Sequence, residues 1–346
     1  MLPRPNQRRW QVLEVIIAIF ILLSLIVYAL MGGADFGGGM WDLLAVGPRG
    51  RRQREAIAKA IAPIWEANHV WLILVVVLLF TAFPRGFAAM MTALNIPITA
   101  MLLGIVLRGS AFMFRKYDVK DDAVQRRWST LFGVSSFFTP FFQGVTLGAL
   151  TTGQIRVEQG RVLTGFFAGW LTPFALVCGV FALALFAFLA ATYLTVDAKD
   201  EPEVQEDFRL RALWTGLSLA PIALVVFLTS QRGAPEMYHG LTRWWAPVLL
   251  AWTSLMAVAA LVAVWLRRFV VARLAAIGQV TLILAGWGLA QYPNLVTPDV
   301  TVLNAAAPDR TMRLLVIALG FGAILLLPSL AFLFYIFKGR DRGRFS

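Results

Sequence analysis

The sequence holds very few of the residues that bind metals and redox groups. It contains one cysteine, Cys178, and two histidines, His69 and His239. A single cysteine excludes an internal disulfide and a cysteine-ligated cluster, and a thiol within an apolar run behaves as a small core residue. Membrane haems usually take His or Met axial ligands, so two histidines at different depths exclude a chain of several haems. We therefore expect no metal or redox centre held by this chain's own side chains.

Charged residues are also scarce. They make up 14% of the chain against 59% hydrophobic residues, which excludes a water-soluble domain. A helix needs roughly 20 apolar residues to cross a bilayer. Runs of that kind lie at residues 12–31 (continuing as helix to about 45), 57–83, 86–107, 130–152, 163–195, 211–230, 244–266, 270–290 and 313–337. The sequence predicts an all-α integral membrane protein with about nine transmembrane helices. They form one domain over residues 1–346, with an ordered, proline-containing loop at 291–312.

Acidic residues are fewer than basic ones, 19 against 31, which gives a formal net charge of +12. Such an excess is also found in nucleic-acid-binding proteins, but here it is unevenly distributed. Most basic residues fall on one side of the predicted membrane, in the segments Arg49–Lys59, Arg108–Arg127, Lys199–Arg211, Arg267–Arg273 and Lys338–Arg344. The positive-inside rule places these in the cytoplasm, with the N-terminus outside and the C-terminus inside. We expect no nucleic-acid partner, and we expect the acidic connector 197–211 to be a solvated loop.

A carboxylate surrounded by glycines interrupts the first apolar run. Asp35 is flanked by the packing candidates Gly33, Gly37, Gly38 and Gly39. A glycine inside a helix costs roughly 0.8–1.0 kcal/mol relative to alanine, so this cluster needs a reason. Small residues at four-residue spacing let another helix approach closely. An ionisable group at membrane depth is also a functional-site hypothesis by default, and both interpretations remain open for this segment.

A second polar cluster lies in the next predicted span, in Trp65-Glu66-Ala67-Asn68-His69-Val70-Trp71. At the angular spacing of a helix, Glu66 and His69 lie within about 60° of each other with Trp65 beside them, whereas Asn68 and Trp71 point roughly the opposite way. A lipid-facing acid costs about 2.5–3.5 kcal/mol. Glu66 is therefore paired, protonated or in contact with water, and this helix lies between its own bundle and another partner.

The predicted depths of the two acids suggest a route for protons. Asp35 lies roughly 35 Å down the first helix, near the cytoplasmic boundary, and Glu66 about 14 Å inward from the start of a helix at residue 57. Neighbouring carboxylates in a medium of low dielectric can pass protons at physiological pH. The competing interpretation is a buried pair of Glu66 with His69 or an arginine that holds helices in register. His69 itself suits a hydrogen-bonding core residue, and Arg108 either anchors a helix end or neutralises a buried acid.

These motifs resemble subunit II of the cytochrome bd quinol oxidases. The resemblance covers most of the chain in order and rests on the glycine-flanked Asp35 followed by Trp41-Asp42, on Pro63-x-Trp65-Glu66-x-Asn68-x-Val70-Trp71 with a Phe83-Pro84 exit, and on Leu107-Arg108-Gly109 with Phe112 and Arg115. It implies two four-helix bundles plus one peripheral helix, in the bacterial cytoplasmic (inner) membrane. It also implies a heterodimer with a subunit I that carries haems b558, b595 and d and oxidises quinol with O2, while subunit II binds no haem.

The resemblance also implies roles for single residues. Glu66 fills the place of a proton-path carboxylate, usually Asp, and Asp35 that of the second acid of the first-helix motif. Trp71 corresponds to a tryptophan near an oxygen route, and Trp65, Asn68 and Arg108 are further interface or oxygen-route candidates. The family leaves open a bound quinone or lipid and a small accessory subunit.

Two positions depart from the family pattern. Gly32 stands where many members have a further acid, so Asp35, Asp42 or water must serve any proton entry there. His69 replaces what is often Gln. Two other functions remain open: a proton-coupled secondary transporter, which midplane acids and proline-broken helices also suit, and a pure assembly scaffold in which both acids are dispensable.

Overall fold

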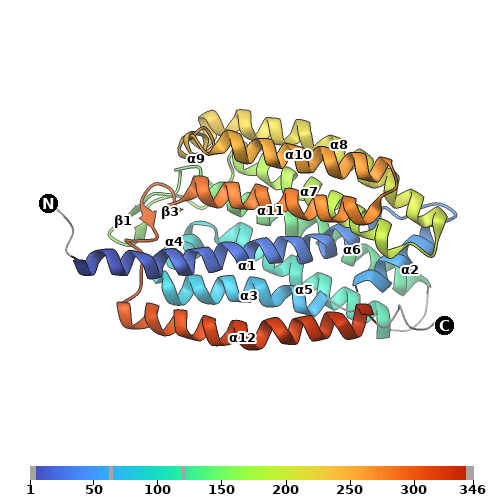
Figure 1. Ribbon diagram of the computed structural model, residues 1–346, viewed down its shortest axis with the longest axis horizontal. Coiled ribbons are helices and arrows are strands. Elements are labelled where there is room, and N and C mark those ends of the chain that lie inside the picture. The colour runs from blue at the N-terminus through green and yellow to red at the C-terminus, as the bar shows by residue number, and fades with distance from the viewer. Residues whose placement is uncertain (1–4, 62–64, 118–121, 340–346) are drawn as a thin grey trace.

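The computed structural model describes residues 5–61, 65–117 and 122–339, and almost all of them are helical (Figure 1). The long helices are α1 (Pro5–Leu43), α3 (Trp65–Ala82), α5 (Asn95–Tyr117), α6 (Asp122–Ala149), α7 (Pro173–Asp197), α8 (Pro202–Gly233), α10 (Ala246–Trp265), α11 (Phe269–Gln291) and α12 (Asp309–Gly339). The short helices are α2 (Gly50–Ile61), α4 (Pro84–Ala93) and α9 (Pro235–Leu241). Two antiparallel hairpins pair β1 (Val157–Glu158) with β2 (Arg161–Val162) and β3 (Asn294–Val296) with β4 (Val300–Thr301).

Length and apolar composition identify the helices that can cross a membrane. Among the described residues six qualify, namely α1, α5, α7, α8, α10 and α11. The number rises to seven if α3 and α4, which are bent by 117° at their junction, form one broken span. The expected all-helical membrane protein is confirmed at this level, whereas about nine crossings remains a prediction.

Two predicted spans have different boundaries in the structure. The span expected at 57–83 is described in two parts, α2 up to Ile61 and α3 from Trp65, and residues 62–64 lie outside the described residues. The span expected from residue 86 starts instead as α4, because Pro84 lacks an N–H and cannot continue α3. The span expected from residue 163 starts at Pro173, where the side chain of Thr172 accepts a hydrogen bond from the N–H of Ala175 at 3.2 Å.

Helix α1 lies at the centre of the bundle, packed against α3, α6, α7 and α11 (Figure 1). Its glycines stand where neighbouring helices come closest. A Cβ on Gly37 would lie 2.1 Å from the carbonyl oxygen of Phe186 in α7, and one on Gly33 would lie 2.8 Å from the Phe186 ring. One on Gly38 would meet Ile61 of α2, and one on Gly39 would meet Ser136 of α6. The glycines therefore allow three other helices to reach the backbone of α1.

Five apolar side chains pack together beside α1 in the half of the bundle that contains its N-terminus. Ile17 and Ile21 of α1 pack there with Val75 and Leu78 of α3 and Val145 of α6, and each is at most 7% exposed. This set of five residues, here called the apolar layer, lies on the N-terminal side of Tyr28 along α1.

At the opposite end, the acidic connector differs from the expected solvated loop. Helix α8 begins at Pro202, so most of the connector is helical, and its acids bind α2 and the residue before it. Arg49 pairs with Asp207 at 2.7 Å, and Arg52 pairs with Glu201 and Glu203 at 2.9 and 2.6 Å. These contacts raise the pKa of both arginines and fasten α2 to the start of α8.

The two hairpins meet at the N-terminal end of α1. Asp299 accepts hydrogen bonds from Arg156 Nε and from the N–H of Val157, each at 2.8 Å. The Arg156 hydrogen bond is the main cause that holds the pKa of Asp299 below its usual value. The N–H of Thr297 donates to the carbonyl of Leu150 at 3.0 Å. The expected loop at 291–312 is thus an ordered hairpin tied to the end of α6.

Candidate functional site

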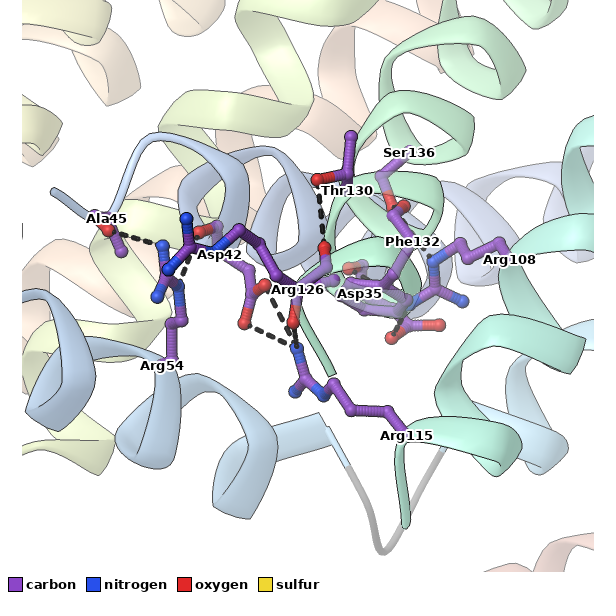
Figure 2. Close-up of polar contacts among 11 residues, drawn as sticks. Asp35, Asp42, Ala45, Arg54, Arg108, Arg115, Arg126, Thr130, Phe132 and Ser136 are labelled. Atoms are coloured by element: carbon purple, nitrogen blue, oxygen red, sulfur yellow. Dashed lines mark hydrogen bonds and ion pairs between the residues drawn. The ribbon is translucent and has the colours of Figure 1, made fainter. Parts of the chain in front are cut away.

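A buried ion pair joins α1 to α5. Arg108 Nη2 donates to Asp35 Oδ1 at 2.5 Å and to the Asp35 carbonyl at 3.2 Å (Figure 2). Both side chains are 1% exposed. Arg108 Nε donates to Ser136 Oγ of α6 at 3.2 Å, so the guanidinium binds three polar groups from two helices. Of the two roles considered for Arg108, the structure has it neutralise a buried acid.

A second ion pair joins the same two helices about two turns further along each of them. Arg115 donates from Nη1 to the carboxylate oxygens of Asp42 at 2.9 and 3.0 Å (Figure 2). The acids and the arginines are each seven residues apart, as expected for two helices running in the same direction. The Phe132 ring of α6 lies between the two guanidinium groups, 4.9 Å from that of Arg108 and 5.3 Å from that of Arg115.

Sequence reasoning missed Arg115 and Phe132 as parts of this site. Asp42 had been considered only as a substitute for a missing acid, and Phe132 lies in a run that reads as ordinary core. The equal spacing of the two acids and the two arginines was a signal that could have revealed the double pair. It needed the additional knowledge that α1 and α5 run in the same direction past each other.

The polar residues of α3 contact α1. Asn68 is fully buried, and its Nδ2 donates to the Met31 carbonyl at 3.4 Å. The His69 ring lies 6.3 Å from the Tyr28 ring and 6.2 Å from the Phe36 ring, measured between centroids. Asn68 and His69, expected on opposed sides of their helix, therefore both face α1.

The two tryptophans of this motif lie in different surroundings. Trp65 packs on Phe112 of α5 with centroids 5.7 Å apart. Trp71 packs against the buried cluster that includes Tyr28 and Phe36, with its Nε1 buried and lacking a protein partner among the described residues.

Glu66 stands in the first turn of α3, and its side chain lies outside the described part of the structure. The contact of Asn68 with Met31 fixes the level of this turn on the antiparallel α1 (Figure 1). Two residues before Asn68 corresponds to about two residues after Met31, so the backbone of Glu66 is nearly level with Asp35. Level with Gly33, the backbone of Glu66 lies only about 3 Å from the level of Asp35, on the side of the N-terminus of α1, so the expected order of a shallower Asp35 and a deeper Glu66 stays a prediction.

The site combines fixed charges with buried polar atoms that lack a protein partner. Asp35 Oδ2, Asn68 Oδ1 and His69 Nδ1 are buried without a hydrogen bond to any described residue. Further along α1, Gln143 Nε2 of α6 donates to the Tyr28 hydroxyl at 2.7 Å. Chemically, such a site can bind water and pass protons between neighbouring groups.

The two histidines lie in different parts of the structure. His69 is on α3 against α1, whereas His239 is an exposed residue of α9. In the described residues, no group of three or more His, Cys, Asp or Glu side chains could hold a metal ion. The donor set needed to hold a haem between two imidazoles is therefore not brought together within the described chain.

Comparisons with known proteins cover nearly the whole chain. A sequence model of the family "Cytochrome bd terminal oxidase subunit II" matches residues 13–337. A "Putative cytochrome bd menaquinol oxidase subunit II" of Bacillus subtilis is 26% identical over 341 residues, 95% of this chain and 96% of that protein. "Cytochrome bd-I ubiquinol oxidase subunit 2" of Escherichia coli K12 is 29% identical over 221 residues, 63% of this chain and 56% of that protein.

The fold has a close counterpart among solved structures. A chain in the structure of the bd oxidase from Geobacillus thermodenitrificans matches with a TM-score of 0.75 and 22% identity. The match covers 94% of this chain and 98% of the other.

Proposed function

Because this chain belongs to the cytochrome bd terminal oxidase subunit II family, we propose that it is the haem-free subunit of a quinol:O2 oxidoreductase in the bacterial inner membrane. Its partner is a subunit I that holds haems b558, b595 and d, oxidises quinol and reduces O2 to water. This chain is not catalytic alone. The separation of His69 from His239 supports a role without haem, and the family membership favours this function over a secondary transporter.

The proposal includes nine crossings, with the N-terminus outside and the C-terminus in the cytoplasm. Nine described helices have 18 residues or more, and α1 begins at one end of the bundle while α12 ends at the other (Figure 1). The two bundles are α1, α3, α5 and α6, then α7, α8, α10 and α11, with α7 packed against α1 and α6 where the bundles meet. Helix α12 contacts α1 and α3 at the edge and is the peripheral helix.

We further propose that the chain contributes a cytoplasmic proton path through Asp35, Glu66 and His69. The observation that supports it is the similar level of Glu66 and Asp35 beside His69, where Oδ2 of Asp35 has no partner among the described residues. In this arrangement Glu66 binds the transferred proton. Arg108 pairs with Oδ1 of Asp35, and Oδ2 stays available to bind a proton carrier. Trp65, Asn68 and Trp71 position this turn against α1, α5 and the partner subunit.

The test is Glu66→Gln in the assembled complex. We expect the subunits to co-purify with unchanged haem absorbance, while oxygen consumption with excess quinol falls at least about tenfold, the scale of a lost proton-transfer group. Glu55→Gln is the matched control, because Glu55 is an exposed acid of α2 paired only with Arg51. Unchanged turnover of an assembled Glu66→Gln complex would remove the path and leave the scaffold function. A colourless chain that purifies without a haem-bearing partner would overturn the subunit role itself.

A further inference from the structure

We propose that α1 and α3 enclose a binding site for water, formed by Asp35 Oδ2, Asn68 Oδ1 and His69 Nδ1. The site does not rest on the proton path proposed above, because it follows from the contacts of these two helices. It adds bound water as a constituent of the subunit interior and names the three atoms that hold it.

Buried polar atoms without a hydrogen bond are concentrated where α1 contacts α3. Buried polar groups in folded proteins are almost always hydrogen-bonded, to protein or to ordered water. Here three buried atoms on facing turns of two helices have no partner among the described residues. Asp35 is 2% exposed and Asn68 is fully buried, so bulk solvent does not reach these side chains.

Asn68 and His69 of α3 face the stretch of α1 that contains Asp35. Asn68 donates to the Met31 carbonyl, one turn before Asp35. The His69 ring lies between Tyr28 and Phe36, and Phe36 is the residue after Asp35. The unpaired atoms therefore lie on one short segment of the α1–α3 contact.

The donors and acceptors of water complement the three unpaired atoms. The unpaired oxygens of Asp35 and Asn68 are acceptors, and His69 Nδ1 is an acceptor or a donor according to its tautomer. The two oxygens cannot satisfy each other, because a hydrogen bond requires a donor, and Nδ1 of His69 could at most supply one of them. A water molecule supplies two donors and accepts in return, and buried waters typically make about three hydrogen bonds to groups of this kind.

The hydrated segment has a defined extent along α1. Arg108 closes it on the α5 side by binding the other oxygen of Asp35. Toward the N-terminus of α1, the Tyr28 hydroxyl accepts from Gln143, and the apolar layer follows with Ile21 and Ile17. The water site therefore lies between a buried ion pair and an apolar region.

The experiment is hydroxyl-radical footprinting of the assembled complex by a brief X-ray pulse in 18O-labelled water, read by mass spectrometry. Bound water generates radicals beside it, so even a buried aromatic ring is labelled when water lies within reach. Phe36 and Phe83 are both 0% exposed, and Phe83 lies in the outer apolar core. We expect labelling of Phe36 and His69 but not of Phe83. Equal, background labelling of Phe36 and Phe83 would overturn the proposal.

Variants assign the water to the named atoms. Asn68→Leu should reduce labelling of Phe36 and His69 several-fold, because it removes one acceptor and fills its space. Asn95→Leu is the matched control: its Oδ1 is also buried without a described partner, but it lies at the far end of α5, about 20 Å from Arg108. Equal effects of the two substitutions would overturn the assignment.

A high-resolution map of the wild-type complex decides the matter if Asn68→Leu fails to assemble. Ordered water within hydrogen-bond distance of all three atoms supports the site, and direct protein contacts at those atoms overturn it. Labelled Phe36 together with unchanged turnover of Glu66→Gln would keep the water site and remove the proton path, so the two proposals fail separately.

Discussion

Arg108 binds Asp35 twice, through the carboxylate and through the backbone carbonyl, although the two residues are 73 positions apart in the chain. Removing only the cation would leave a buried carboxylate without its partner, which costs about 3–5 kcal/mol. We therefore expect Arg108→Leu to lower the thermal stability of the complex severely, measured as the fraction still assembled after heating. The double variant Asp35→Leu/Arg108→Leu should recover much of the loss, because two apolar side chains leave no unpaired charge. A double variant less stable than Arg108→Leu would contradict this account.

The second pair should matter less. Asp42 is fully buried, but the Arg115 side chain is 15% exposed and also reaches Ser129. We expect Arg115→Leu to cost about 1–3 kcal/mol, because water can partly replace the lost hydrogen bonds. The same heating assay of assembled complex tests the ranking. If Arg115→Leu lost as much stability as Arg108→Leu, the greater solvent exposure of Arg115 would not weaken the contribution of its ion pair.

Gly37 should tolerate no side chain. A Cβ there would stand 2.1 Å from the Phe186 carbonyl and 2.6 Å from the Ala190 methyl, so α1 and α7 would have to separate. We expect Gly37→Ala to destabilise the complex by about 1–3 kcal/mol, the usual cost of overpacking.

Gly320 in α12 is the matched control for Gly37, since nothing lies within 4 Å of its added Cβ. Gly320→Ala should be neutral or stabilising by about 0.4–1 kcal/mol through the unfolded state. Similar losses at both positions, measured by thermal unfolding of the purified complex, would argue against close helix approach as the reason for the glycine at 37.

Acid pH should destabilise the two hairpins, because Asp299 becomes protonated. Its pKa is lowered in the folded protein, mainly by the hydrogen bond from Arg156. The stabilisation is therefore complete above the ordinary carboxyl pKa of about 3.9 and disappears as the pH falls through the lower folded value. Asp299→Asn should reduce stability by about 1 kcal/mol at neutral pH.

The pH dependence distinguishes this charge effect from loss of shape. The difference in thermal stability between wild type and Asp299→Asn should narrow below about pH 4, as the wild-type carboxyl becomes protonated. Asp309→Asn provides a comparison at an exposed acid of the same end of the protein. A difference that stays constant down to acid pH would exclude the ion pair as its source.

The membrane class and the motif residues were predictable from sequence, because apolar composition over long runs is a local property. Helix boundaries were less so. The end of the second span at Phe83-Pro84 was predicted, and α3 ends there at Ala82. The division of the next span into α4 and α5 was not, because Leu94 at their junction is neither proline nor glycine. The depth of Glu66 was measured from residue 57, whereas the contact of Asn68 with Met31 relates this turn directly to α1.

The contacts between side chains of different helices could not be predicted from the sequence alone. Arg108 had been given two roles, and only the packing of α5 beside α1 decides between them. His69 was grouped with Glu66 by helical angle, yet its ring lies against Tyr28 and Phe36. A helical wheel gives the direction of each side chain but not the position of the neighbouring helix.

The apolar layer of Ile17, Ile21, Val75, Leu78 and Val145 gives the subunit an electrical property. Charge that enters beside Asp35 meets hydrocarbon before it reaches the opposite surface, and ions cross hydrocarbon only at great cost. The layer separates the buried pair of Asp35 with Arg108 from Glu14, a second buried acid nearer the N-terminus of α1. A subunit built in this way can contain water in its interior without letting ions cross and dissipate the membrane potential.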